Sequence, residues 1–150
     1  MDSLDLQVLQ QAREWHAQGQ PVWLVTVIET WGSAPRPPGA LLAMRGDGLV
    51  VGSVSGGCVE DDLIDRVRKG ERVAKPSLIN YGVSKEEAAR FGLPCGGNLR
   101  LVQEPLTDTA WVDEVLTRTS RHELVARKLD LNTGLVSIEP AARGEAFQFD

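Results

Sequence analysis

The run Val22-Trp23-Leu24-Val25-Thr26-Val27-Ile28 constrains this fold more than any other part of the chain. It is almost wholly apolar and rich in β-branched residues, which is typical of a strand buried on both faces. Pro21 stands before it and cannot continue a helix. Because such a strand needs other elements against both faces, the sequence predicts an α/β fold, with α+β as the alternative, built from a mixed β-sheet and flanking helices.

The remaining elements follow from hydrophobic spacing and from turn residues. A helix is expected before the central strand, between a capping Ser3 and a terminating Gly19. An irregular, proline-stiffened loop is expected over 29–39. The other expected elements are a hairpin of 40–45 and 49–54 around Gly46-Asp47-Gly48, a helix over 59–67 capped by Gly70, a strand over 77–81, a short helix opened by Ser84-Lys85-Glu86-Glu87, a strand over 98–104, a helix over 110–120 and a hairpin turning at Asn132-Thr133-Gly134.

Length and composition suit one soluble domain and exclude several functions. At 150 residues, with 42% hydrophobic and 25% charged residues, the chain has the size and composition of a single globular domain. Its formal net charge of -5 disfavours a nucleic-acid partner, which usually selects a basic surface. The sequence has no signal-peptide pattern and no apolar run near the roughly 18 residues of a membrane span, so we expect a cytoplasmic protein.

A first glycine loop, Ser53-Val54-Ser55-Gly56-Gly57-Cys58, joins a predicted strand directly to a predicted helix. The backbone N–H groups of Ser55, Gly56 and Gly57 can turn toward an anion without obstruction by side chains. The alternative is that the two glycines only make a sharp turn. Spacing alone leaves both interpretations open.

Three carboxylates, Glu60-Asp61-Asp62, stand in the first turn of the helix after this loop. They complement the helix dipole and would oppose a multiply charged anion. A phosphate would therefore need positive charge from elsewhere, and Arg36 and Arg45 are the candidates. The alternative for each arginine is a solvated surface position.

Cys58 ends the first glycine loop, and Cys95 lies in a second one, Leu93-Pro94-Cys95-Gly96-Gly97. In a reducing compartment both are expected to be free thiols. Two thiols on flexible loops suit a soft metal such as molybdenum, or transient sulfur transfer, unless each is simply a small buried apolar residue. A structural zinc site is disfavoured, because His16 and His122 lie on separate predicted elements and at no recurring zinc spacing.

The segment Thr30-Trp31-Gly32-Ser33-Ala34-Pro35-Arg36 combines an aromatic ring, hydroxyls, a cation and a proline in one expected loop. Loops on rigid scaffolds often carry binding groups. Trp31 could stack on a planar heterocycle, and Arg36 could pair with a phosphate or a polar ring edge. The alternative is that Trp31 closes the rim of the core.

Together these segments resemble the XdhC/CoxI family of molybdoenzyme accessory proteins over about residues 20 to 106. The resemblance depends on the order and approximate spacing of several motifs, which makes it more specific than a lone glycine motif. The matching motifs are Gly32-Ser33-Ala34-Pro35-Arg36 with Gly39-Ala40, Gly52-Ser53-Val54-Ser55-Gly56-Gly57-Cys58-Val59-Glu60, Gly92-Leu93-Pro94-Cys95-Gly96-Gly97 and Glu104-Pro105-Leu106.

The resemblance implies a chaperone that is not itself an enzyme. Such a protein binds the molybdenum cofactor (molybdopterin) transiently, while a cysteine desulfurase partner helps to install the sulfido ligand, and delivers the cofactor to apo-xanthine dehydrogenase. The resemblance assigns cofactor contact, and contact with molybdenum, first to Cys58 and Cys95. The weaker assignments to the cofactor are Ser55, Gly56, Gly57, Gly96, Gly97 and Arg36.

Many family members continue into a Rossmann-type domain, and this sequence carries no such fingerprint. The resemblance therefore implies that residues 1–150 form an XdhC/CoxI-type N-terminal domain, and a homodimer is an open alternative to a monomer. Two other functions stay open. The first is a sulfurtransferase that carries a persulfide on Cys58 or Cys95, and the second is a structural domain that docks the target enzyme.

Overall fold

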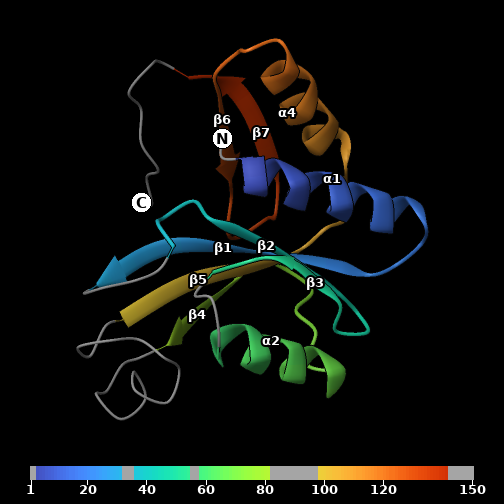
Figure 1. The fold of residues 1–150 in the computed structure, drawn as a ribbon, viewed down its shortest axis with the longest axis vertical. Helices are drawn as coiled ribbons and strands as arrows, with labels where there is room; N and C mark the ends of the chain where they lie inside the picture. The colour runs from blue at the N-terminus through green and yellow to red at the C-terminus, as the bar shows by residue number, and fades with distance from the viewer. Residues whose placement is uncertain (1–2, 32–35, 55–57, 82–97, 142–150) are drawn as a thin grey trace.

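The computed structural model describes residues 3–31, 36–54, 58–81 and 98–141 (Figure 1). Its helices and strands follow one another in the order that the sequence predicts. They are α1 (Ser3–Ala17), β1 (Val22–Trp31), β2 (Leu41–Arg45), β3 (Val50–Gly52), α2 (Cys58–Arg68), β4 (Ser77–Tyr81), β5 (Asn98–Pro105), α4 (Ala110–Ser120), β6 (Val125–Leu129) and β7 (Val136–Pro140).

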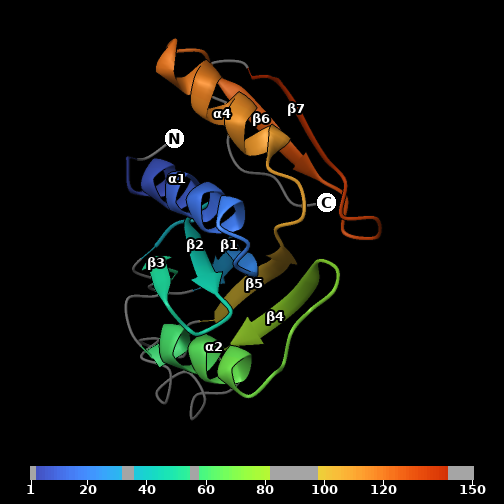
Figure 2. The same cartoon turned by 90° about the vertical axis from the view of Figure 1, so that its right-hand side faces the viewer.

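Five strands form the main sheet in the order β3-β2-β1-β5-β4, and β6 and β7 form a separate hairpin. The predicted α/β character is confirmed. Within the described ranges every strand pairing is antiparallel, so the main sheet is antiparallel rather than mixed as expected, and the fold takes the α+β form of the prediction. A short turn at 46–49 reverses the chain between β2 and β3, whereas α2 carries it across the sheet from β3 at one edge to β4 at the other (Figure 2).

The central strand β1 is buried on both faces, as its sequence predicts. Trp23, Val25 and Val27 pack on the side of the sheet that α2 covers. Val22 and Leu24 pack on the opposite side, with α1. Figure 1 shows α1 and α2 on opposite sides of the sheet, so one strand supplies apolar side chains to both layers of the core.

The strand β1 is longer than the sequence predicts. Residues 29–31 were expected to belong to an irregular loop, and this expectation is wrong. The register between β1 and β5 shifts between Val27 and Glu29, and Trp31 then pairs with Asn98. A bulge of this kind, together with a partner strand far along the chain, extends the strand in a way that local sequence does not show.

A further layer of α4, β6 and β7 lies beyond α1 (Figures 1 and 2). Its apolar residues continue the core on the α1 side, where Val112 and Val115 of α4 are buried. The predicted helix over 110–120 and the predicted hairpin around 132–134 are confirmed. The helix expected at Ser84 to Glu87 lies outside the described residues. No described helix has the length and apolar character needed to cross a membrane.

Candidate functional site

The segments that carry the sequence motifs are anchored at one end of the sheet. The last residue of β1, Trp31, is paired with the first residue of β5, Asn98. The edge strand β4 ends beside them at Tyr81. The segment 32–35 follows the end of β1, and the segment 82–97 connects the end of β4 to the start of β5. Both segments are therefore attached at neighbouring strand ends. We call this region the motif end of the sheet (the left side of the sheet in Figure 1).

The start of α2 is fastened to the same end by a buried tyrosine. The hydroxyl of Tyr81 donates a 2.7 Å hydrogen bond to Asp62, which also pairs with Arg66 at 2.9 Å. Tyr81 is 1% exposed, and burial followed by the hydrogen bond to Asp62 raises the pKa of its hydroxyl. The hydroxyl therefore stays a donor at neutral pH. Since Cys58 begins α2 about one turn before Asp62, its backbone lies at the motif end too.

A second contact closes the first glycine loop. The backbone N–H of Val54 donates to the carboxylate of Glu60 at 3.0 Å, which joins the residue before the segment 55–57 to the first turn of α2. Of the three carboxylates expected to repel an anion, Glu60 and Asp62 therefore each accept a hydrogen bond from within the protein. Sequence reasoning missed this role, although a glutamate three residues inside a helix start is a known capping signal.

Arg36 lies at the motif end, but it is held by the framework. Its Nη2 pairs with Asp5 of α1 at 3.1 Å, and its Nε donates to the carbonyl of Ser53 at 3.3 Å. The same Asp5 oxygen accepts the N–H of Leu41 at 3.1 Å. The side chains of Arg36 and Asp5 are 18% and 11% exposed. Asp5 thus connects α1 to Arg36, which follows the loop after β1. Arg36 in turn contacts Ser53, which precedes the segment 55–57 of the first glycine loop. No feature of Asp5 in the sequence indicated this role.

The other predicted site residues are placed only in part. Cys58 is placed as the first residue of α2. Ser55, Gly56, Gly57, Cys95, Gly96 and Gly97 lie outside the described residues, so the convergence of the two thiols stays a prediction. Arg45, the other candidate cation, is brought to the opposite end of the sheet, since it pairs with Val22 at the start of β1. Among the described residues no group of three or more His, Cys, Asp or Glu side chains could hold a metal ion.

Two surface cavities lined by described residues lie away from the motif end. One of about 600 Å³ lies between α1 and α4, beside His16 and Arg13. The other, of about 130 Å³, lies between the end of β5, the start of α4 and the β6–β7 hairpin. Its wall includes Glu104, whose carboxylate pairs with Arg127. The motif Glu104-Pro105-Leu106 is thus about a strand length away from the two glycine loops.

Comparisons with known proteins agree on one family. The model of the XdhC and CoxI family matches residues 15–82, a range that runs from the end of α1 to the end of β4. The molybdenum cofactor insertion chaperone PaoD of Escherichia coli strain K12 is 32% identical over 132 residues, which cover 82% of this chain and 38% of PaoD. A protein of Bacillus subtilis strain 168, named as a probable subunit of xanthine dehydrogenase, is 33% identical over 75 residues, or 50% of this chain and 23% of that protein.

A solved structure shares the fold. The crystal structure of a protein named as a xanthine dehydrogenase from Bacillus halodurans matches with a TM-score of 0.59 and 26% identity, over 88% of this chain and 40% of that chain. In each of these comparisons the match spans less than half the length of the relative.

Proposed function

Because the chain belongs to the XdhC and CoxI family, we propose that it binds the molybdenum cofactor and assists its insertion into a xanthine-dehydrogenase-type molybdoenzyme. The relative named as a molybdenum cofactor insertion chaperone supports this role, and it aligns with 82% of the chain. In this proposal the chain acts as a maturation factor in the cytoplasm rather than as an enzyme. It holds the cofactor transiently while a cysteine desulfurase supplies the sulfido ligand.

The single observation that carries the proposal is the common anchoring of the motif segments. Strand ends at Trp31, Tyr81 and Asn98, and the start of α2 at Cys58, lie at one end of the sheet. This placement supports a site that the loop after β1, the first glycine loop and the second glycine loop form together. A cofactor with a pterin, a phosphate and a metal needs contacts of several chemical kinds, which separate loops can provide.

The residues present suit this cofactor chemically. Thiolates are soft ligands that suit molybdenum, and Cys58 stands at the first residue of α2. Asp62 in the first turns of that helix pairs with Arg66, which offsets part of its repulsion of an anionic group, and Glu60 is engaged by the N–H of Val54. We assign metal contact to Cys58 and Cys95 and pterin or phosphate contact to the backbone of 55–57 and 96–97. Arg36 supports these loops through Asp5 and contributes positive charge beside them.

The test measures cofactor carried by the protein. The chain is produced in cells that make molybdopterin, purified, denatured, and assayed for released pterin by the fluorescence of its oxidised form. We expect the wild type to release pterin, and Cys58→Ala and Cys95→Ala each to release at least about tenfold less. Loss of a contact that supports a metal site weakens metal affinity on this scale. Ser120→Ala, on α4, is the matched control and should keep the wild-type load.

Two results would contradict the proposal. Absence of pterin from the wild-type chain would show that it does not hold the cofactor by itself. Equal loads in the wild type and both cysteine variants would exclude a role for the thiols. Mass spectrometry after incubation with a cysteine desulfurase and cysteine separates the sulfurtransferase alternative, because a carried persulfide adds the mass of one sulfur atom to the cysteine-containing peptide.

A further inference from the structure

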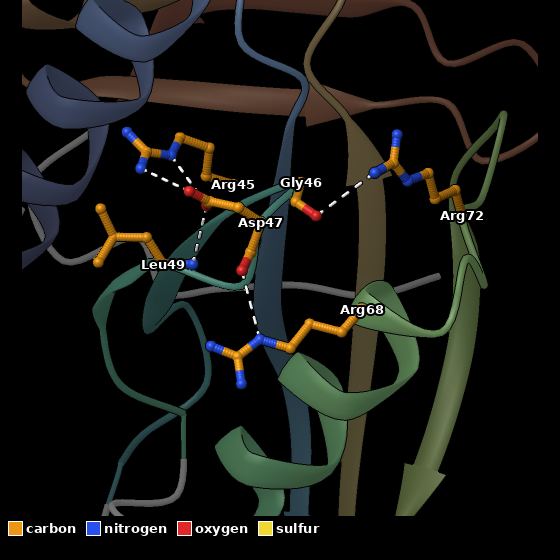
Figure 3. A network of polar contacts seen from close by, with 6 residues as sticks. All are labelled: Arg45, Gly46, Asp47, Leu49, Arg68 and Arg72. Atoms are coloured by element: carbon orange, nitrogen blue, oxygen red, sulfur yellow. Dashed lines mark hydrogen bonds and ion pairs between the residues drawn. The ribbon is translucent and has the colours of Figure 1, made fainter.

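The turn between β2 and β3 lies at the end of the sheet opposite the motif end, and three arginines surround it (Figure 3). Arg45 pairs with Asp47 at 2.6 Å through Nη2. Arg68, the last residue of α2, donates to the carbonyl of Asp47 at 3.3 Å, and Arg72 donates to the carbonyl of Gly46 at 3.3 Å. We call this cluster, residues 45–49 with Arg68 and Arg72, the arginine turn.

Two of these arginines lack a carboxylate partner in the part of the chain that the structure describes. Within residues 3–31, 36–54, 58–81 and 98–141, Arg68 and Arg72 each form one hydrogen bond to a carbonyl and no ion pair. Their neighbours differ: Arg66 pairs with Asp62, and Lys69 pairs with Asp65 at 2.8 Å. A guanidinium has five N–H donors, so most donors of these two exposed side chains face solvent.

Each of the two guanidinium groups has a further contact that favours its position at the turn. The Arg72 guanidinium lies 5.4 Å from the ring of Trp23, whose indole N–H donates to the carbonyl of Val73 at 3.1 Å. The Arg68 Nε lies only 2.5 Å from where a Cβ on Gly48 would stand, so this glycine lets the arginine close against the turn. Side chains that are already ordered lose less entropy when they bind a ligand.

An apolar side chain stands beside these charges. Leu49, just before β3, is 49% exposed, and its N–H donates to the carboxylate of Asp47. The cluster therefore offers two cations that form no ion pair with a described residue, and one aliphatic anchor, in a chain whose formal net charge is -5. Arginines next to exposed apolar residues are typical of protein–protein contacts.

We propose that the arginine turn is a docking surface for an acidic segment of a protein partner, which places carboxylates on Arg68 and Arg72 and an apolar side chain on Leu49. A protein fits better than a nucleic acid, because the exposed Leu49 offers an apolar contact that a phosphate backbone does not use, and because the formal net charge of the chain is -5. The surface lies at the far end of β1 from the motif end, so a partner can stay bound while the motif end is occupied.

The test uses a fluorescein-labelled synthetic peptide in which Glu and Leu alternate. Its binding to the full chain is followed by fluorescence anisotropy at low ionic strength. We expect Arg68→Gln and Arg72→Gln each to raise the Kd for the peptide about fivefold, and the double variant to raise it about twentyfold. These changes correspond to the upper end of the interaction energies of exposed ion pairs. Lys69→Gln is the matched control, because Lys69 follows the same helix but is paired with Asp65, and it should weaken binding less than about twofold.

A further variant controls for the possibility that the arginine substitutions weaken binding by disrupting the turn. Leu49→Ser keeps the backbone bond to Asp47 and should still weaken peptide binding severalfold, with unchanged thermal unfolding. The proposal is overturned if the wild type does not bind the peptide, if Lys69→Gln weakens binding as much as the arginine variants, or if a peptide with Gln in place of Glu binds equally well. It is also overturned if a single-stranded oligonucleotide binds more tightly and with the same dependence on Arg68 and Arg72, since that result assigns the surface to a phosphate backbone.

Discussion

The two ends of β1 are braced by polar groups of opposite sign. At the motif end, carboxylates accept hydrogen bonds from their surroundings: Asp5 from Arg36 and Leu41, Glu60 from Val54 and Asp62 from Tyr81. At the arginine turn, guanidinium groups donate to the carbonyls and the carboxylate of one tight turn. Of the carboxylates at the first end, Asp5 is buried and Glu60 and Asp62 are partly buried, whereas most of the guanidinium groups at the second end are exposed.

This difference indicates that the polar groups at the motif end support the fold, whereas those at the arginine turn are available for binding. The buried Asp5 and the partly buried Glu60 and Asp62 connect described segments at the motif end by hydrogen bonds and contribute to folding stability. Exposed guanidiniums with spare donors contribute little to stability and keep capacity for a partner. Substitutions at the motif end should therefore reduce the free energy of unfolding strongly, and substitutions at the arginine turn should reduce it weakly.

The largest expected effect comes from a matched pair of glycines, both with a φ of +94°. A Cβ at Gly52 would lie 2.4 Å from the carbonyl oxygen of Leu41, which is backbone and cannot move aside. A Cβ at Gly48 would lie 2.5 Å from the side chain of Arg68, which can move. We expect Gly52→Ala to lower the free energy of unfolding by about 4 kcal/mol and Gly48→Ala by about 2 kcal/mol, from backbone strain with and without a fixed clash.

Urea unfolding of both glycine variants measures this difference. Equal losses would show that backbone strain dominates at both positions, and the contrast between a rigid motif end and an adaptable turn would then be wrong. A larger loss for Gly48→Ala would reverse the comparison.

The next effect concerns the buried ion pair of the motif end. Asp5→Ala removes the partner of Arg36 and leaves the N–H of Leu41 unpaired, so we expect a loss of about 3 kcal/mol in urea unfolding. Asp5→Asn keeps an acceptor and should lose less than half as much. The control is Asp113→Ala, which breaks the exposed pair with Arg13 and should cost less than about 0.5 kcal/mol. Equal losses for Asp5→Ala and Asp113→Ala would contradict the framework role.

The smallest effect is a pH dependence at the arginine turn. The hydrogen bond from Arg45, and then the N–H of Leu49, lower the pKa of Asp47 from 3.8 to about 2. A lowered carboxyl pKa stabilises the folded state at pH values above 3.8, and this contribution is lost as the pH falls toward 2. Asp47→Asn should therefore be slightly less stable than the wild type at neutral pH, and the difference should shrink between about pH 4 and pH 2.

Thermal unfolding of the two proteins across this range checks the expectation. A difference that stays constant down to about pH 2 would show that the Asp47 carboxylate does not stabilise the turn through Arg45. A difference as large as that of Asp5→Ala at neutral pH would contradict the ranking of the two ends.

Local patterns in the sequence identified the elements well. The buried strand over 22–28, the helix over 110–120 and the hairpin around 132–134 are all present, and α1 and α2 start and end within a few residues of the expected positions. These segments carry their own signals, such as helical spacing, capping residues and turn glycines. The extension of β1 to Trp31 carried no such signal, because it depends on pairing with β5 across a bulge.

The sequence proposes candidate site residues but does not indicate which residues support them. Glycines and thiols stand out in a sequence because their chemistry is unusual, which is why Cys58 and Cys95 are the proposed contacts. Asp5 and Tyr81 do not stand out, since an aspartate on a helix and a tyrosine in a strand are ordinary. Their roles arise only when Arg36 and Asp62 are brought within hydrogen-bond distance.

The sequence by itself determined the layered fold, the central strand and the order of the glycine loops. These features depend on burial and backbone preferences that act within short stretches of chain. Only the tertiary structure decided that Trp31, Cys58, Tyr81 and Asn98 share one end of the sheet, and that Arg45, Arg68 and Arg72 gather at the other. The physical reason is that strand order and helix crossing are set by packing between distant segments, which no local pattern encodes.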